Sequence, residues 1–167
     1  MSSQFLQFLL RFIGLVILQV LICNHVNFLG YINPYVYLVF ILIYPSQNNR
    51  TNFLLASFLL GLTVDIFSDS GGIHAAASVF SAFIRPGFLK MSFGSLYEHS
   101  AIKFGNAELG SLLSYVTLMV LSHHLVMFGL DFFQLAEILN ILKNTLFSGV
   151  FTVVLSVIII LLFDSNK

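Results

Sequence analysis

The chain alternates between long apolar runs and short polar breaks. The breaks carry turn residues, as in Pro-Ser-Gln-Asn-Asn over 45–49 and Ser-Asp-Ser-Gly-Gly over 68–72, which favour chain reversal over helix. A helix that crosses a bilayer needs about 20 predominantly apolar residues, and the first, fifth and sixth runs reach that length easily. The pattern predicts six transmembrane helices over 5–23, 28–44, 53–67, 72–84, 109–130 and 145–163.

Composition places the chain in a membrane. Hydrophobic residues make up 58% of its 167 residues and charged residues only 8%, whereas a soluble domain is about 25% charged. The mean hydropathy is +0.97, and so little polar mass leaves no room for a separate soluble domain. The formal net charge is zero and no basic tract occurs, which argues against binding nucleic acid. We therefore expect an all-α polytopic membrane protein, a compact bundle forming one domain over 1–167.

The first run is interpreted as a membrane helix and not as a cleavable signal peptide, because Arg11 lies inside it and no A-x-A site follows,. Lys and Arg concentrate on the cytoplasmic side of polytopic proteins. With the N-terminus inside, six basic residues lie inside and one, Lys143, lies outside, which predicts two cytoplasmic termini. The six are Arg11, Arg50, Arg85, Lys90, Lys103 and Lys167. The cytoplasmic stretch 85–108 is expected to be an interfacial connection.

Polar residues recur at helical spacing within several runs. Lipid offers a polar group no partner, so these stripes should face neighbouring helices. The result should be a bundle with close helix contacts. The stripes are Ser57, Gly61, Asp65 and Ser68; His74, Ser78, Ser81 and Arg85; Thr145, Gly149, Thr152 and Ser156; and the weaker Ser111, Tyr115 and Ser122.

Asp65 is the acidic residue that lies well inside an apolar run. A carboxylate at the bilayer centre costs about 2.5–3.5 kcal/mol on insertion scales, so a partner should compensate for it. We expect Asp65 to accept hydrogen bonds from the backbone of 70–72 or from His74, and so to fix a helical hairpin. A proton or ion site is the alternative interpretation.

The hairpin 53–84 is short for two crossings. Its residues span about 48 Å as helix at 1.5 Å each, and two crossings need about 60 Å. Either the helices extend to Asn49 and past Pro86, or the turn at 68–72 is recessed. A recessed turn would have to be buried in protein or line a cavity. This makes the surroundings of Asp65 and His74 the best candidate for a small pocket or a partner groove.

Other residues give no catalytic or metal signature. Neighbouring helical residues point about 100° apart, so His123 and His124 are expected to be structural. The single cysteine, Cys23, excludes an internal disulfide,. No nucleophile elbow, zincin, P-loop or dinucleotide motif occurs,. This agrees with the expectation of a non-enzymatic chain that needs no cofactor, which the resemblance described next implies.

The stretch 61–67, Gly-Leu-Thr-Val-Asp-Ile-Phe, followed by Gly-Gly-Ile-His-Ala-Ala over 71–76, resembles the MreD family of bacterial rod shape-determining membrane proteins. That family has a G-x-x-x-D motif in a middle span and a glycine turn before the next span. The matched positions are Gly61, Asp65 and Gly72. The motif residues expected to serve structure or partner binding are Gly61, Asp65, Gly71, Gly72, His74 and Arg85.

The resemblance implies a scaffold or regulator of the peptidoglycan elongation complex, in the bacterial cytoplasmic (inner) membrane. Members associate with MreC, and through it with MreB filaments, the RodA glycosyltransferase and a class B penicillin-binding transpeptidase. By this resemblance the partners are a MreC-like protein and membrane lipid, and a groove formed by the spans is the working surface.

The alternative is a substrate-binding S component of an energy-coupling-factor vitamin transporter, to which MreD is similar in fold. S components carry a small-x-x-x-small motif, typically of alanines, on the first span. Here 8–16 contains no alanine, which favours the scaffold.

Overall fold

The computed structural model describes residues 3–30, 32–45, 49–94 and 102–164. Within these ranges the regular secondary structure is helical, apart from one isolated bridge between Phe28 and Ile32. The helices α1 to α7 and the short 3₁₀ turns η1 to η3 follow one another along the chain. They are α1 Ser3–Leu21, η1 Cys23–His25, α2 Leu38–Leu42, α3 Arg50–Ser68, α4 Ile73–Phe93, η2 Phe104–Asn106, α6 Leu109–Phe132, η3 Leu135–Glu137 and α7 Ile138–Asp164.

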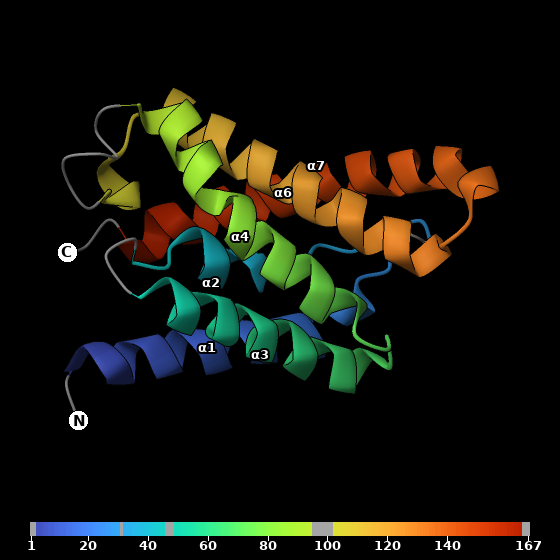
Figure 1. The fold of residues 1–167 in the computed structure, drawn as a ribbon, viewed down its shortest axis with the longest axis horizontal. Helices are drawn as coiled ribbons and strands as arrows, with labels where there is room; N and C mark the ends of the chain where they lie inside the picture. Colours follow the sequence, from blue (N-terminus) through green and yellow to red (C-terminus); the bar gives the residue numbers. More distant parts are fainter. Residues whose placement is uncertain (1–2, 31, 46–48, 95–101, 165–167) are drawn as a thin grey trace.

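The long helices run between two ends of the molecule. α1 begins and α7 finishes at one end, here called the terminal end, where α3 begins and α4 finishes as well (Figure 1). The α3–α4 turn at 69–72 and the α6–α7 turn at 133–137 lie at the opposite end, here called the hairpin end. Successive helices along the chain therefore run in opposite directions. The sequential pairs α3–α4, α4–α6 and α6–α7 pack against each other, and α2 lies among α1, α4, α6 and α7.

The stretch 28–44 is not a spanning helix, and its prediction as one was wrong. Among the described residues of this stretch, only those of α2, five residues long, are helical. Pro34 lacks a backbone donor and disfavours helix at the residue before it. An uninterrupted apolar run also has no periodicity that separates a buried helix from another buried segment. The described residues of 22–45, here called the second crossing, lead from the hairpin end toward the terminal end largely as irregular backbone (Figure 1).

Irregular backbone at membrane depth must be buried in protein, and the second crossing meets this condition. Residues 36–42 are no more than 2% exposed. Side chains of the neighbouring helices satisfy its backbone groups: the Gln19 amide donates to the Pro34 carbonyl at 3.2 Å and accepts from the Tyr37 N–H at 3.4 Å. This segment is the centre of the hydrophobic core.

The α3–α4 hairpin extends at both ends beyond its predicted bounds. Asn49 caps α3 by accepting from the Thr51 N–H at 2.9 Å, and α4 continues through Pro86 to Phe93. The 19 and 21 residues of these helices correspond to about 29 and 32 Å. Each is about as long as the hydrocarbon is thick, roughly 30 Å, so the expected extension of the two helices is confirmed. Of the two, α3 is also apolar enough to count as a candidate membrane span, whereas α4 is not. Of the expected connection 85–108, the first part is helix, and 95–101 lie outside the described residues.

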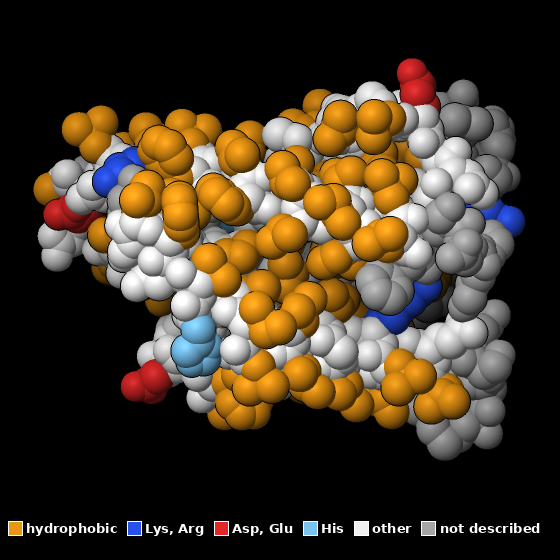
Figure 2. All heavy atoms as spheres, turned by 180° about the vertical axis from the view of Figure 1, so that it is seen from behind, with side chains coloured by type: hydrophobic (Ala, Val, Ile, Leu, Met, Phe, Trp, Pro, Cys, Tyr) orange, Lys and Arg blue, Asp and Glu red, His pale blue; other side chains and the backbone are white. Residues whose placement is uncertain are grey.

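The remaining helices agree more closely with the pattern. α1 and α6 match their predicted ranges to within two residues, whereas α7 begins seven residues earlier than predicted, at Ile138 instead of Thr145. Among the described residues, four helical segments are long and apolar enough to cross a membrane: Leu6–His25, Arg50–Ser68, Leu109–Phe132 and Ile138–Leu162. Apolar side chains cover the middle of the face in Figure 2, and charged side chains stand mainly toward its two ends.

Candidate functional site

Gly61 is the point where α3 comes closest to α4. A Cβ atom built at Gly61 would lie 2.4 Å from the His74 carbonyl oxygen and 2.5 Å from the Ala75 Cα. These are backbone atoms of the first turn of α4, which cannot move aside as a flexible side chain can. Only glycine therefore lets the start of α4 rest directly on α3.

Asp65 lies one turn after Gly61, and its carboxylate accepts three hydrogen bonds from the same region. Oδ1 accepts from the Ser70 hydroxyl at 2.6 Å and from the His74 N–H at 2.9 Å. Oδ2 accepts from the Ala75 N–H at 2.8 Å. The first turn of a helix has unpaired N–H groups and a positive dipole end, which an anion stabilises. The predicted bonding to His74 is confirmed, with the donors being a hydroxyl and two helical N–H groups.

Asp65 replaces a cap that α4 lacks. The residue at the N-cap position is Gly72, which has no side chain to cap the helix. Gly71 and Gly72 have φ angles of +66° and +99°, in the left-handed region that favours glycine. These two glycines let the chain reverse tightly, while the capping oxygen comes from α3. Gly61, Asp65, Gly71, Gly72 and His74 are thus brought together in one structure, here called the α3–α4 junction.

Arg85 lies elsewhere, eleven residues along α4 from His74, or about 16 Å along the helix axis. Its guanidinium donates to the Leu42 carbonyl at 3.0 Å, the Tyr44 carbonyl at 2.6 Å and the Tyr115 hydroxyl at 2.8 Å. Its side chain is 3% exposed. The expectation of Arg85 as a charge in a cytoplasmic connection was wrong, because it lies in the protein interior and holds the end of the second crossing. Its place on a protein-facing stripe is confirmed.

Most residues of the predicted polar stripes are buried. Ser57, Ser78, Ser81, Thr152 and Ser156 are fully enclosed. Ser57 and Ser81 each donate to the carbonyl four residues earlier. This agrees with close helix contacts through small polar residues.

A buried chain of polar side chains runs from the junction across the core, and the sequence did not predict it. The Tyr37 hydroxyl lies 3.0 Å from His74 Nδ1 and 2.8 Å from His123 Nε2. His123 Nδ1 lies 3.3 Å from His124 Nδ1, and His124 Nε2 lies 3.2 Å from the Thr152 hydroxyl. This chain links α4, the second crossing, α6 and α7. His123 and His124 therefore have the structural surroundings expected for them, in direct contact with each other.

Tyr37 is the residue that sequence reasoning missed. A helix over 28–44 would have placed it on one face of a span, whereas irregular backbone lets its hydroxyl reach two histidines from different helices. Thr152 completes the connection by accepting from the Tyr35 N–H at 3.0 Å. The one signal available in the sequence was that Tyr37 and His123 carry polar atoms within apolar runs. Each such atom needs a hydrogen-bond partner when it is buried.

A polar pocket of about 330 Å³ opens at the hairpin end beside the junction. Asn24, Asn33, Ser68 and His74 contribute its polar lining. The Asn24 amide donates to the Ser68 hydroxyl at 2.9 Å. Asp65 does not line the pocket and is 4% exposed. His74 thus belongs to both the junction and the pocket, and the carboxylate only to the junction.

The described part of the chain contains no group of three or more His, Cys, Asp and Glu side chains placed to hold a metal ion. Comparison with protein-family models, curated proteins and solved structures found no match. The fold defines the class of protein: within its described residues it is a helical membrane protein with four helices long and apolar enough to span a membrane.

Proposed function

We propose that this chain is a non-enzymatic scaffold or regulator of the peptidoglycan elongation complex, similar to MreD, in the bacterial inner membrane. Its N- and C-termini are cytoplasmic in this proposal. It controls cell shape by binding a MreC-like protein and, through that protein, MreB, the RodA glycosyltransferase and a class B penicillin-binding transpeptidase. The sequence resemblance over 61–76 is the source of these partners.

One observation carries the proposal: Gly61 and Asp65 act as a single device at the α3–α4 junction. Glycine admits the first turn of α4, and one turn later the carboxylate binds that turn. This gives a physical reason for the spacing G-x-x-x-D, which is the motif that resembles MreD. Three of the roughly four acceptor sites of a carboxylate are thereby used within the junction, which supports a rigid binding surface over the proton or ion site.

The exposed apolar faces of the spans supply a surface for the partner. Ile66, Phe67, Phe58 and Leu55 of α3 are each more than 40% exposed, and they lie on the helix that the junction fixes. A transmembrane helix of a partner packs on such a face through shape and van der Waals contact. The junction sets the angle of α3 and thereby the shape of this face.

The test is capture of a MreC-like protein encoded beside this chain, co-expressed with a tagged copy. We expect the unmodified chain and the Asp69→Asn control, an exposed acid in the same turn, to retain the partner. Asp65→Asn should lose most of it. A folded, monodisperse unmodified chain that captures no MreC-like protein contradicts the proposal. Equal capture by Asp65→Asn would remove the carboxylate from it.

The polar pocket favours a second candidate, the S component of a vitamin transporter. Its volume of about 330 Å³ falls within the usual range of about 300–1,000 Å³ for small-molecule sites, and amide and imidazole groups line it. Mass spectrometry of the denatured, purified protein distinguishes the two candidates. One molecule of vitamin per molecule of protein would favour the transporter. Absence of a vitamin, in protein that was purified without washing steps that could remove it, would favour the scaffold.

A further inference from the structure

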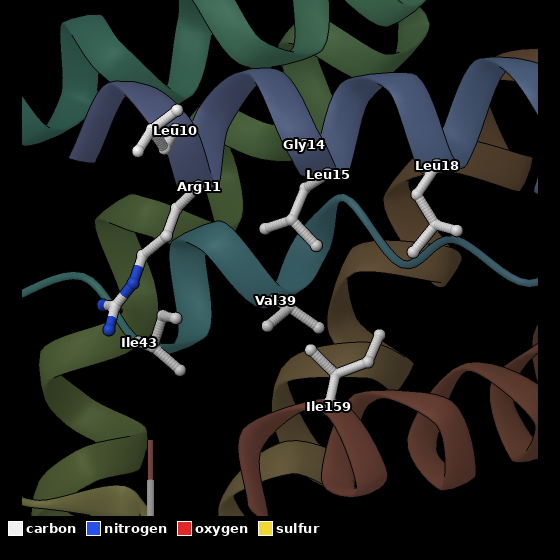
Figure 3. A pocket seen from close by; sticks show the side chains of 8 residues that line it. All are labelled: Leu10, Arg11, Gly14, Leu15, Leu18, Val39, Ile43 and Ile159. Atoms are coloured by element: carbon white, nitrogen blue, oxygen red, sulfur yellow. The ribbon is translucent and has the colours of Figure 1, made fainter. Parts of the chain in front are cut away.

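A lateral groove separates α1 from α7 because the second crossing is mostly not helical. The short helix α2 lies between α1 and α7 and contacts both. A groove of about 450 Å³ remains beside it, lined mainly by Arg11, Gly14 and Leu15 of α1, Val39 and Ile43 of the second crossing, and Ile159 of α7 (Figure 3).

The groove opens at the surface of the bundle and is closed at its floor. Val39 is 0% exposed and Leu15 is 8% exposed, whereas Leu10 on the rim is 61% exposed. Gly14 lies on the exposed side, and a Cβ built there would have no atom within 4 Å. The missing side chain therefore widens the groove. In a membrane this opening faces hydrocarbon, so an acyl chain has the right chemistry to fill it.

Arg11 gives the groove a polar end. Its side chain extends from α1 past Ile43, away from Leu18 and toward the terminal end (Figure 3). The exposed bases Arg50 and Lys103 also lie toward the terminal end, beside the start of α3 and beside η2 (Figure 1). A guanidinium binds phosphate oxygens through two parallel N–H bonds. An apolar groove with a cation at its headgroup end matches a lipid with an acyl chain and a negatively charged phosphate.

We propose that this groove binds an anionic phospholipid such as phosphatidylglycerol, with one acyl chain between α1 and α7 and its phosphate on Arg11. The net negative headgroup is favoured over a zwitterionic one because choline would place a second cation near the guanidinium. Arg11 also interacts within the chain, and its five N–H donors allow it to do both. The inference does not depend on the proposed scaffold function.

The test is native mass spectrometry of the purified full chain, titrated separately with dioleoyl phosphatidylglycerol and dioleoyl phosphatidylcholine. The unmodified chain should bind one phosphatidylglycerol at least about tenfold more tightly than it binds phosphatidylcholine. About tenfold is the factor expected for one charge-assisted interaction. Arg11→Gln should abolish this preference and Arg11→Lys should keep part of it. Arg50→Gln, which removes an exposed base outside the groove, should keep all of it.

Filling the groove supplies an independent test. Gly14→Leu should weaken binding of both lipids at least about tenfold, while the control Gly87→Leu, at an open and exposed position on α4, should match the unmodified chain. Gel filtration and thermal melting establish that each variant is folded. Equal affinity of the unmodified chain for both lipids overturns the proposal. So does an Arg50→Gln variant that loses the preference for phosphatidylglycerol to the same extent as Arg11→Gln. So does a Gly14→Leu variant that keeps its lipid and loses a captured partner protein, since the groove would then seat a protein helix.

Discussion

At the scale of single residues, the α3–α4 junction shows how a carboxylate is accommodated in the protein interior, where Asp65 is buried. Asp65 costs free energy to bury as an ion, and three donors on one face offset that cost. Two of the donors are N–H groups that the start of α4 would otherwise leave unpaired. The acid and the helix end therefore satisfy each other, and Gly61 makes the distance short enough.

Gly61→Ala should destabilise the chain. The added methyl group would overlap the backbone of His74 and Ala75, and overpacking of this kind costs about 1–3 kcal/mol. Thermal or denaturant unfolding in detergent should show the loss. Gly149→Ala is the matched control, because its Cβ would have ordinary contacts, the nearest at 3.6 Å from Leu121. Equal unfolding midpoints for the two variants would show that α3 and α4 are not so close.

How much could be predicted at this scale depended on distance along the chain. The bond between Asp65 and His74 spans nine residues, so a hairpin assumption was enough to find it. The contacts of Tyr37 with His74 and His123 span 37 and 86 residues. No local pattern specifies pairs so far apart, and an incorrect helix over 28–44 hid the position of the hydroxyl.

At the scale of elements, the second crossing is the part that hydropathy alone describes wrongly. From its apolar residues the burial of this segment was predicted correctly and its backbone conformation wrongly. The reason is that burial in protein and burial in lipid both select apolar side chains. What differs is the backbone, whose unpaired groups require partners from α1, α4 and α7. Gln19, Arg85 and Thr152 supply them, and their polarity within apolar runs is explained by this role.

Arg85→Met should loosen the end of the second crossing. It removes the donor to the Tyr44 carbonyl, and a buried acceptor left unpaired costs roughly 1–3 kcal/mol. The Leu42 carbonyl loses one donor and keeps the Tyr115 hydroxyl at 3.0 Å. Unfolding should occur at lower denaturant. Lys103→Met, at an exposed position, should leave the midpoint unchanged. A midpoint for Arg85→Met that equals the control would show that water or other groups satisfy these carbonyls.

At the scale of the whole molecule, the described segments between the helices gather at two ends (Figure 1). The starts of α1 and α3 lie at the terminal end, and the turns after α3 and α6 lie at the hairpin end (Figure 1). The charge pattern predicted the same division. The second crossing does not change this division, because it leads the chain back toward the terminal end although it is largely irregular.

Cysteine accessibility tests this division. In a Cys23→Ala background, Arg50→Cys and Lys103→Cys should react with a membrane-impermeant maleimide from one side. Asp69→Cys and Asp131→Cys should react only from the other, since all four positions are exposed. Labelling of positions 50 and 69 from the same side would show that α3 does not cross.

The central claim is that Asp65 caps α4 from the neighbouring helix. Hydrogen exchange at the amides of His74 and Ala75 measures this directly, in the unmodified chain and in the Asp65→Asn and Asp69→Asn variants. Asp65→Asn should speed exchange at one of the two amides at least, because an amide side chain has one acceptor oxygen where the carboxylate has two. Asp69→Asn should leave them slow. Unchanged protection in Asp65→Asn would contradict the claim.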